Sequence, residues 1–328
     1  MMRNARLIRI FVLSLVTSTL TAQAQSLAPN AGTKADEAGE YYRMGAAQAE
    51  RSDFAEAAKN LERAVSLRPT FALAYNDLGY VYYRMGRIEE ARKAYLEAIR
   101  LKSDYALAYN NLGMALSASG KYEEAIDALN RAVSLSSNYA AAYYNLGATL
   151  YRAGRSYEAI DALKRALALK ADYTEAHYSL GLAYTEVGRY AEAVESFRSA
   201  LARQPRLGLA AKGLGLAFHK QGKLEEAIEA YRLAIALIQD DAESYNNLGV
   251  AYAEAHRFKE AIAAYQQALR LNPSYYEAHY NLGAAYLSIN KRAEAIKEYS
   301  ALKSAEKELA NNLYRLIYQQ SVLTLTYK

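Results

Sequence analysis

The side chains of this chain that could do chemistry are four histidines and a repeatedly used asparagine. Histidine binds metal ions and transfers protons, but His177, His219, His256 and His279 form no recognisable motif with their neighbours. The sequence contains no cysteine, no HExxH pattern and no Gly-x-Ser-x-Gly pattern. We therefore expect no catalytic site, no cofactor and no metal, so that the protein is not an enzyme. The alternative is an enzyme whose site has no recognisable sequence motif.

The asparagine belongs to a phrase that recurs along the chain. It reads AYNDLG from Ala74, AYNNLG from Ala108 and SYNNLG from Ser244, and YNLG ends at Gly147 and again at Gly283. An asparagine side chain offers a hydrogen-bond donor and an acceptor, so it can pair with the backbone of a bound peptide of any sequence. Peptide recognition is therefore a candidate chemistry for this phrase.

Aligned on its glycine, the phrase reveals an internal repeat. The glycine recurs every 34 residues, and an alanine follows each one after 12 residues. The glycines are Gly45, Gly79, Gly113, Gly147, Gly181, Gly215, Gly249 and Gly283. Seven units carry a second alanine, whereas the eighth carries Leu302 at that position. A fixed period of this size indicates a solenoid in which each unit packs on its neighbours.

The spacing within a unit predicts two helices. Tyr75, Leu78 and Gly79 lie at i, i+3 and i+4, and Ala91 and Ala98 mark a second helical stripe. A glycine inside a helix costs about 1 kcal/mol of helix propensity. We therefore expect the small residues to mark where two paired helices touch.

Turn and cap signals separate these helices. A left-handed glycine is expected to close each first helix, at Gly86, Gly120, Gly154, Gly188 and Gly222, with His256 and Asn290 in later units. Side chains suited to N-caps are expected to begin the next first helix, at Asp104, Asp172, Asp240 and Ser274.

These features resemble the tetratricopeptide repeat (TPR) family. Residues 72–105 match its Leu-Gly, aromatic and alanine positions, with Ser103 in place of the family's proline, and eight such units cover residues 38–302. The resemblance implies an all-α fold, a right-handed superhelical solenoid of eight α-α helix pairs. In this family the first helices line a concave groove that binds extended peptides or partner helices. Residues 303–328 resemble a capping helix and tail, with Leu309, Leu313, Leu316 and Ile317 available to cover the last pair.

Positions are counted from the first residue of each unit, so that Ala72 is position 1 and Tyr105 is position 34 of the second unit. By the same resemblance, position 6 of each unit faces the groove. The candidate peptide-binding residues there are Asp77, Asn111, Asn145, Asn247 and Asn281. They resemble the asparagine ladder in the repeat domain of the O-linked N-acetylglucosamine transferases, although Ser179 and Gly213 interrupt the series. The alternative is that these amides are ordinary polar residues of the family's helix surface.

Aromatic side chains are the second group of candidates. Four amides at about 1 kcal/mol each do not offset an association cost of about 4 kcal/mol or more, so apolar contacts must contribute. Candidate stacking surfaces are Tyr42, Tyr144, Tyr178 and Tyr280 at position 5, with Tyr83 and Tyr151 at position 12; the alternative is ordinary packing. The carboxylate clamp of chaperone-binding members is missing, since no asparagine stands at position 9. Residues 208–241 depart most from the repeat, which indicates a flexible joint or a drifted unit.

Residues 1–24 have the three parts of an export signal. A basic start ending at Arg9 precedes an apolar run over residues 10–20, and Ala22 and Ala24 suit cleavage after Ala24. The apolar run is shorter than the about 20 residues that a membrane span needs. An uncleaved anchor or a buried helix is the alternative. Residues 25–37 are expected to be a flexible linker.

The charge balance limits the partners. The chain has 40 basic and 35 acidic residues, and removing the three arginines of the signal leaves 37 and 35, a net charge of +2. A net charge this close to zero does not attract nucleic acid. We predict a non-catalytic scaffold that is exported to the bacterial periplasm. It should bind a protein or peptide partner in its groove, as a monomer and without membrane insertion. The alternative is a structural subunit of a bacterial cell-envelope complex that docks through its convex face or C-terminal cap.

Overall fold

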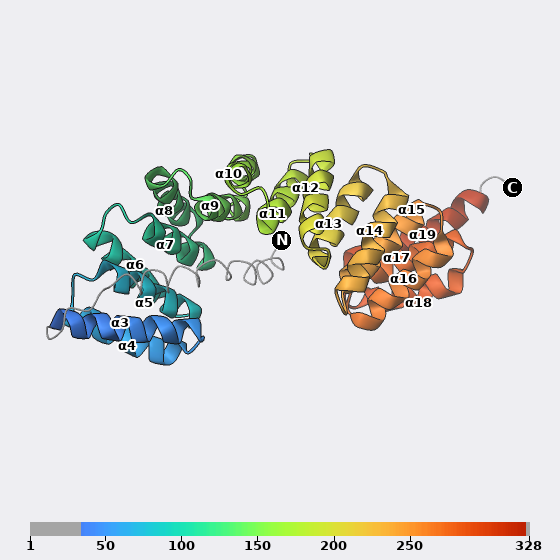
Figure 1. Ribbon diagram of the computed structural model, residues 1–328. Coiled ribbons are helices and arrows are strands. Elements are labelled where there is room, and N and C mark those ends of the chain that lie inside the picture. The colour runs from blue at the N-terminus through green and yellow to red at the C-terminus, as the bar shows by residue number, and fades with distance from the viewer. Residues whose placement is uncertain (1–33, 326–328) are drawn as a thin grey trace. The chain divides into compact units, whose positions relative to one another are not determined.

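The computed structural model describes residues 34–325, and within that range the chain is all helical, with seventeen helices and no strand (Figure 1). The helices form eight pairs followed by one further helix. The predicted α-α solenoid with a C-terminal capping helix is therefore confirmed. The predicted export signal, residues 1–24, lies outside the described residues. Inside them, no helix combines the length and apolar character needed to cross a membrane.

The two helices of each pair have nearly constant lengths. The first helices are α3 (Lys34–Glu50), α5 (Ala72–Arg84), α7 (Ala106–Ala118), α9 (Ala140–Arg152), α11 (Thr174–Glu186), α13 (Gly208–Lys220), α15 (Ala242–Glu254) and α17 (Tyr276–Ser288). The second helices are α4 (Phe54–Leu67), α6 (Ile88–Leu101), α8 (Tyr122–Leu135), α10 (Ser156–Leu169), α12 (Tyr190–Arg203), α14 (Leu224–Leu237), α16 (Phe258–Leu271) and α18 (Arg292–Lys303). The capping helix is α19 (Lys307–Leu325).

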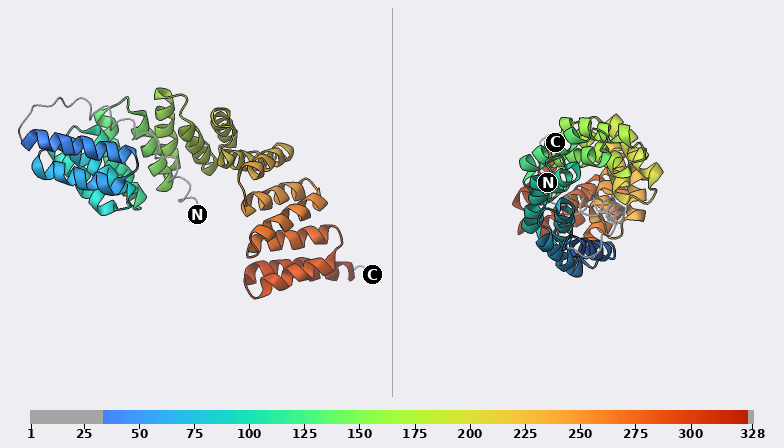
Figure 2. Two further views of the ribbon diagram at one scale, coloured as in Figure 1. Left: turned by 60° about the horizontal axis from the view of Figure 1, so that its bottom comes forward. Right: turned by 60° about the vertical axis from the view of Figure 1, so that its left-hand side comes forward.

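The chain divides into two units, a first unit that ends at Ser179 and a second unit that begins at Leu180. Within each unit the pairs follow one another in chain order, as α3 to α10 and α12 to α19 illustrate (Figure 2). Successive first helices touch one another, for example α5 and α7 or α13 and α15, whereas successive second helices have fewer contacts. The first helices therefore form the inner, more closely spaced layer of each superhelical stack.

Glycine lets the two helices of a pair touch. A Cβ atom placed on Gly113 would lie 2.5 Å from Cγ of Leu129, and one on Gly249 would lie 2.5 Å from Cε1 of Tyr265. Real Cβ atoms do not approach other carbons this closely. The prediction that the small residues mark the helix contacts is therefore confirmed, and the alanines of the second stripe, such as Ala125, are fully buried.

The turn signals are confirmed and the N-cap signals are wrong. Gly120 closes its helix with a φ of 81°, and His256 and Asn290 take the same left-handed conformation at 57° and 59°. The next first helix, however, begins one residue later than Asp104 or Ser274, with Tyr105 and Tyr275 at the N-cap position and no side-chain cap. In these two helices a ring stands at the N-cap position, and the burial of Tyr105 shows that this ring packs into the core.

The capping helix α19 replaces the missing neighbour of the last pair. Gly283 of α17 faces Leu313 of α19, whose Cδ2 would lie 2.6 Å from an added Cβ. In earlier pairs that space is filled by the second helix of the same pair. Leu313 and Ile317 are buried, as predicted. The second helix α18 instead turns Tyr299 toward Tyr314, with ring centroids 5.7 Å apart.

Candidate partner-binding face

Side chains at positions 5 and 6 join neighbouring first helices. Each bond links two residues 35 apart, from position 5 of one repeat to position 6 of the next. Nδ2 of Asn111 donates to Oδ1 of Asn76 over 3.0 Å, and Nδ2 of Asn145 donates to Oδ1 of Asn110 over 2.8 Å. In the second unit, Asn281 donates to Asn246 over 3.1 Å, and in the first the Tyr42 hydroxyl donates to Asp77 over 2.7 Å. We call these bonds inner rungs.

The inner rungs correct the expectation that the position 6 side chains are exposed in a groove. Asp77, Asn111 and Asn145 are 2%, 3% and 8% exposed. The first helices approach closely enough for positions 5 and 6 to meet, so the amides bond to each other and not to solvent. Asn247 and Asn281 are half-buried, and within the described part of the chain Asn247 makes no hydrogen bond through its side chain. These two remain accessible.

Asp77 is the ionisable member of the rungs. Its Oδ1 accepts a hydrogen bond from Nδ2 of Asn76 over 2.9 Å, and its Oδ2 accepts the bond from Tyr42. Burial raises the pKa of Asp77 to about 7, although both hydrogen bonds favour the charged form. Burial first, and then the neighbouring Asp77, raises the pKa of the Tyr42 phenol. The Tyr105 hydroxyl nearby is buried and finds no hydrogen-bond partner among the described residues.

The tyrosine candidates divide into two sets. Tyr42 and Tyr144 are buried, and their rings pack on Phe71 and Tyr173 with centroids 5.0 Å and 4.9 Å apart. The expectation that these two offer stacking surfaces is wrong, because position 34 of the same repeat covers them. The other four, Tyr178, Tyr280, Tyr83 and Tyr151, are half-buried on the first helices.

Residues 208–241 are a compensated variant of the repeat. Lys212 stands at position 5 and Asp241 at position 34, where the repeats of Tyr42 and Tyr144 place two rings. Nζ of Lys212 lies 3.3 Å from Oδ2 of Asp241 and 3.0 Å from Oε2 of Glu243. Burial lowers the pKa of Lys212, but the two carboxylates outweigh burial and leave the pKa raised. An ion pair thus takes the place of the ring pair.

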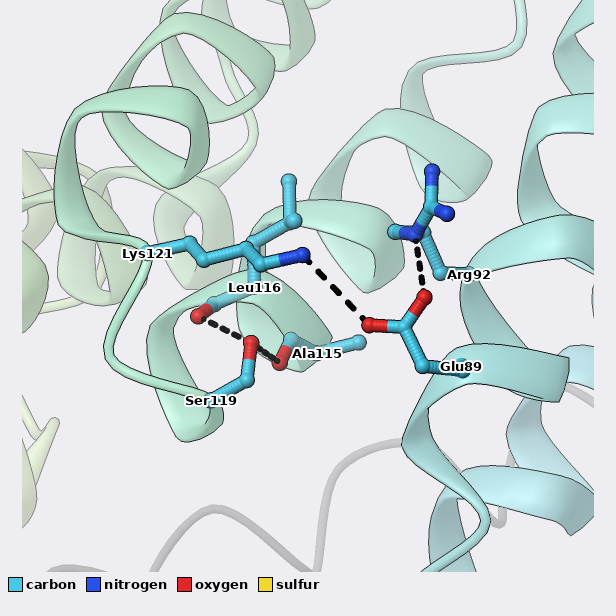
Figure 3. A network of polar contacts seen from close by, with 6 residues as sticks. All are labelled: Glu89, Arg92, Ala115, Leu116, Ser119 and Lys121. Atoms are coloured by element: carbon cyan, nitrogen blue, oxygen red, sulfur yellow. Dashed lines mark hydrogen bonds and ion pairs between the residues drawn. The ribbon is translucent and has the colours of Figure 1, made fainter.

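The second helices are joined by exposed ion pairs. Lys121 reaches Glu89 over 3.4 Å, and Figure 3 shows Glu89 held between Lys121 and Arg92. Arg155–Glu123 and Arg257–Glu225 repeat this spacing of 32 residues. We call these pairs outer rungs. Their side chains are solvated, so each contributes little to stability.

Three of the histidines make hydrogen bonds or ion pairs with neighbouring groups. His279 lies 2.6 Å from Oε2 of Glu298 and 3.1 Å from the carbonyl of Pro273, and His219 lies 2.9 Å from Oε2 of Glu254. His177 bonds the carbonyl of Ala171. In the described range, no three His, Cys, Asp or Glu side chains are close enough to share a metal ion.

The rung partners at position 5 were missed from the sequence. They are Asn76, Asn110 and Asn246, which directly precede the predicted position 6 residues Asp77, Asn111 and Asn247. A signal for them exists in the order of the repeats. Wherever position 5 is asparagine, position 6 of the next repeat is also asparagine, and wherever position 5 is tyrosine, the next position 6 is aspartate, serine or glycine.

Comparisons with known proteins agree on a repeat family. A family model described as TPR repeat matches residues 45–86 and 215–255. Models described as tetratricopeptide repeat match residues 70–138, 104–172, 138–206, 242–275 and 264–298. Together the matches cover residues 45–206 and 215–298. No curated protein sequence matches the chain.

Several solved structures share the fold. The C-terminal part of a TPR repeat-containing protein from Cytophaga hutchinsonii is 20% identical over 73% of this chain and 98% of that one, with a TM-score of 0.59. PilF of Pseudomonas aeruginosa is 22% identical over 63% and 94%, with a TM-score of 0.56. MamA from Desulfovibrio magneticus is 24% identical over 52% and 96%, with a TM-score of 0.50. At these identities the likeness concerns the fold alone.

Proposed function

The chain belongs to the tetratricopeptide repeat family of protein-interaction scaffolds, and from this premise we propose that it binds an extended segment of a protein partner along its first helices. The observation that carries the proposal is a row of half-buried apolar side chains on that layer. In the second unit the row is Leu182, Leu216, Val250 and Ala284 at position 9. Accessible apolar side chains on a rigid scaffold suit the recognition of a peptide.

In this proposal the candidate residues have two roles. The half-buried ones contact the partner, namely Tyr83, Tyr151, Tyr178, Tyr280, Asn247 and Asn281. The buried ones, Asp77, Asn111, Asn145, Tyr42 and Tyr144, hold neighbouring first helices at a fixed spacing. The asparagine series therefore acts on binding mainly by keeping the contact surface in register.

We further propose that the protein is exported to a bacterial periplasm and is non-catalytic. The basic start, apolar run and small residues before Gln25 support cleavage after Ala24. The measurement is the mass of the mature N-terminal peptide from cells that make the full chain. An N-terminus at Gln25 in the periplasmic fraction is expected, and a cytosolic protein that begins at Met1 would overturn the proposal.

A second candidate function is that of an assembly subunit that docks through the capping helix. It is favoured by Tyr314 of α19, which is 47% exposed and lies 4.5 Å, centroid to centroid, from Tyr318. An exposed ring beside a half-buried one suits a protein contact. In this case the inner layer plays no part in recognition.

The deciding experiment is capture of a partner by an affinity-tagged full chain from an extract of the source cells. The test variant is Tyr83→Ser with Tyr151→Ser, on the first helices. The matched control is Tyr157→Ser, because Tyr157 is 71% exposed on the second helix α10. A third variant, Tyr314→Ser, tests the capping helix.

Loss of the partner from the test variant alone, with an unchanged thermal melt, is the expected outcome. Retention by the test variant and loss from Tyr314→Ser would replace the proposal with the assembly function. Equal capture by all variants would contradict both.

A further inference from the structure

Among the residues that the structure describes, two arginines of the first unit lack the carboxylate partner that comparable arginines have. Four half-buried arginines elsewhere each pair with a glutamate three residues away. They are Arg87 with Glu90, Arg92 with Glu89, Arg155 with Glu158 and Arg257 with Glu260. Arg84 and Arg152 are also half-buried, yet within the described residues neither contacts a carboxylate. A cation that has lost part of its hydration is stabilised by a nearby anion, and here the described part of the chain supplies none.

Arg84 is held in place by neutral groups. It is the last residue of α5, and its Nη1 donates to the hydroxyl of Tyr80 over 2.6 Å. Its guanidinium carbon lies 4.5 Å from the centroid of the Phe54 ring. These contacts orient the guanidinium without neutralising it, so its remaining N–H groups keep their capacity to bind an anion.

Arg152 is held in the same way two repeats later. It is the last residue of α9, and its Nη1 lies 3.5 Å from Oγ of Ser117 on the neighbouring first helix α7. Oγ1 of Thr149 bonds the same hydroxyl over 3.1 Å. Ser117 and Thr149 are both buried. The guanidinium is thus anchored at the inner layer by a buried hydroxyl pair.

A role at the helix end does not explain this burial. A cation in the last turn stabilises a helix by interacting with its dipole, and both arginines stand in that turn. Lys220 has the same repeat position on α13 and remains exposed. The dipole interaction is therefore compatible with a solvated cation, and the partial burial of Arg84 and Arg152 needs another reason.

The spacing of the two arginines suits an extended chain. They occupy the same repeat position on α5 and α9, with α7 between them, and packed helices lie about 8–10 Å apart. Two such steps give roughly 16–20 Å, which an extended peptide covers with about five or six residues. Tyr83 and Tyr151 stand directly before the arginines. Glu50 holds the corresponding position on α3, so the basic row ends there.

We propose that Arg84 and Arg152 bind the carboxylates of an acidic segment of the protein partner. The inference rests on the proposed function, since it names the chemistry of the segment that the first helices hold. Glutamates or aspartates about five or six residues apart would each meet one guanidinium, and bidentate pairing makes these bonds directional and strong. The neighbouring tyrosines would contact the residues between the acidic ones.

The test is the binding of labelled peptides to the full chain, followed by fluorescence anisotropy. The acidic probe has about twelve residues with pairs of glutamates roughly five residues apart, and its counterpart carries glutamine at those places. We expect the acidic peptide to bind about tenfold tighter than the glutamine peptide. In Arg84→Gln with Arg152→Gln this preference is lost, whereas Arg84→Lys with Arg152→Lys retains most of it.

The matched control removes two exposed cations from the second helices of the same unit. It is Arg131→Gln with Lys164→Gln, on α8 and α10, and it should keep the preference. A preference that survives in the Arg84 and Arg152 double glutamine variant, or disappears in the control, would overturn the inference. Equal binding of both peptides would also overturn it, and would leave the proposed function standing if Tyr83→Ser with Tyr151→Ser weakened both. Only the partner-capture experiment described above can overturn the proposed function.

Discussion

The two units use the same repeat positions for different chemistry. In the first unit the inner layer is joined by neutral groups, such as the amides of Asn76 and Asn111, and by packed rings. The second unit keeps one amide rung, Asn281 to Asn246, but adds ion pairs, with Lys212 between two carboxylates and His279 beside Glu298. The glycine contacts between paired helices are alike in both units except at Gly283, which faces Leu313 of the capping helix α19.

This difference teaches that backbone spacing and side-chain chemistry are set separately in the repeat. Glycine and alanine at the helix contacts determine how closely the helices pack, and any pair of complementary side chains then satisfies positions 5, 6 and 34. Ionic pairs titrate and respond to salt, whereas amide pairs do not. The two units should therefore respond differently to pH, charge and mutation.

The largest effect is expected at Asp77, the one carboxyl of the inner rungs. Its pKa is about 7 in the fold against 3.8 for the free side chain. A raised pKa contributes stability below pH 4, and that contribution is lost as pH rises to 7. About three pKa units at about 1.4 kcal/mol each amount to roughly 4 kcal/mol. The free energy of unfolding of Asp77→Asn should therefore exceed that of the wild type by up to this amount at pH 8, and should equal it at pH 4.

Urea unfolding at several pH values measures the gain. Asp127→Asn, at an exposed position of α8, is the control and should follow the wild type. In the second unit the hydrogen bond with Glu298 raises the pKa of His279 above 6.5. His279→Gln should therefore flatten the pH dependence only above pH 6.5, where the raised pKa loses its contribution. If Asp77→Asn and His279→Gln changed the free energy of unfolding over the same pH range, the distinction between the units would be contradicted.

The shared glycine contact should be equally sensitive in both units. Gly113→Val and Gly249→Val each place carbon within 2.5 Å of a neighbouring side chain, so overpacking should lower the free energy of unfolding by about 3 kcal/mol. Ala47→Val, at an exposed position of α3, is the control. Chemical denaturation followed by circular dichroism gives the values. If one of the two glycine variants were near neutral, the helix contacts of the two units would differ after all.

The ion pair of the second unit should be exchangeable for the ring pair of the first. Lys212→Met leaves Asp241 and Glu243 facing each other without a cation, which should cost about 2 kcal/mol. Lys212→Tyr with Asp241→Tyr recreates the pair that Tyr144 and Tyr173 form, and should recover most of the loss. Thermal melts at low and high salt compare the variants. A double variant no more stable than Lys212→Met would show that the surroundings of the two pairs differ.

The fold could be predicted from the sequence because its determinants lie in the spacing of single residues. Gly79 and Ala91 recur in phase, and only a stacked helix pair explains that period. The N-caps were predicted wrongly because a local preference for Asp104 was weighed without the core packing of Tyr105, which only the assembled repeats provide.

The site could be predicted only in part. Position 6 was identified as a repeated polar row, but its burial was not predicted, because burial depends on how closely neighbouring first helices approach. Asn110 and Asn145 are both asparagine because their side chains meet where the two helices approach. This correlation is visible only when consecutive repeats are compared. Arg84 and Arg152 carry no signal in the sequence, because what sets them apart is a missing partner in space.

A smaller effect is expected from removing one inner rung. Asn145→Ala leaves the buried carbonyl of Asn110 without its donor, which should lower the free energy of unfolding by about 1–2 kcal/mol. Asn281→Ala in the second unit should cost less, because Asn281 is half-buried and water can replace it at Asn246. Urea denaturation of both variants tests the order. Equal costs would mean that burial does not distinguish the inner rungs.

The smallest effect is expected at the outer rungs, although they look as regular as the inner ones. Lys121→Ala removes the 3.4 Å contact with Glu89, but Glu89 keeps Arg92 at 2.9 Å and both partners are solvated. We expect a loss of about 0.5 kcal/mol or less, and none at high salt. Arg155→Ala should behave alike with respect to Glu123. A loss as large as that of Asn145→Ala would mean that the second helices, and not the inner layer, hold successive repeats together.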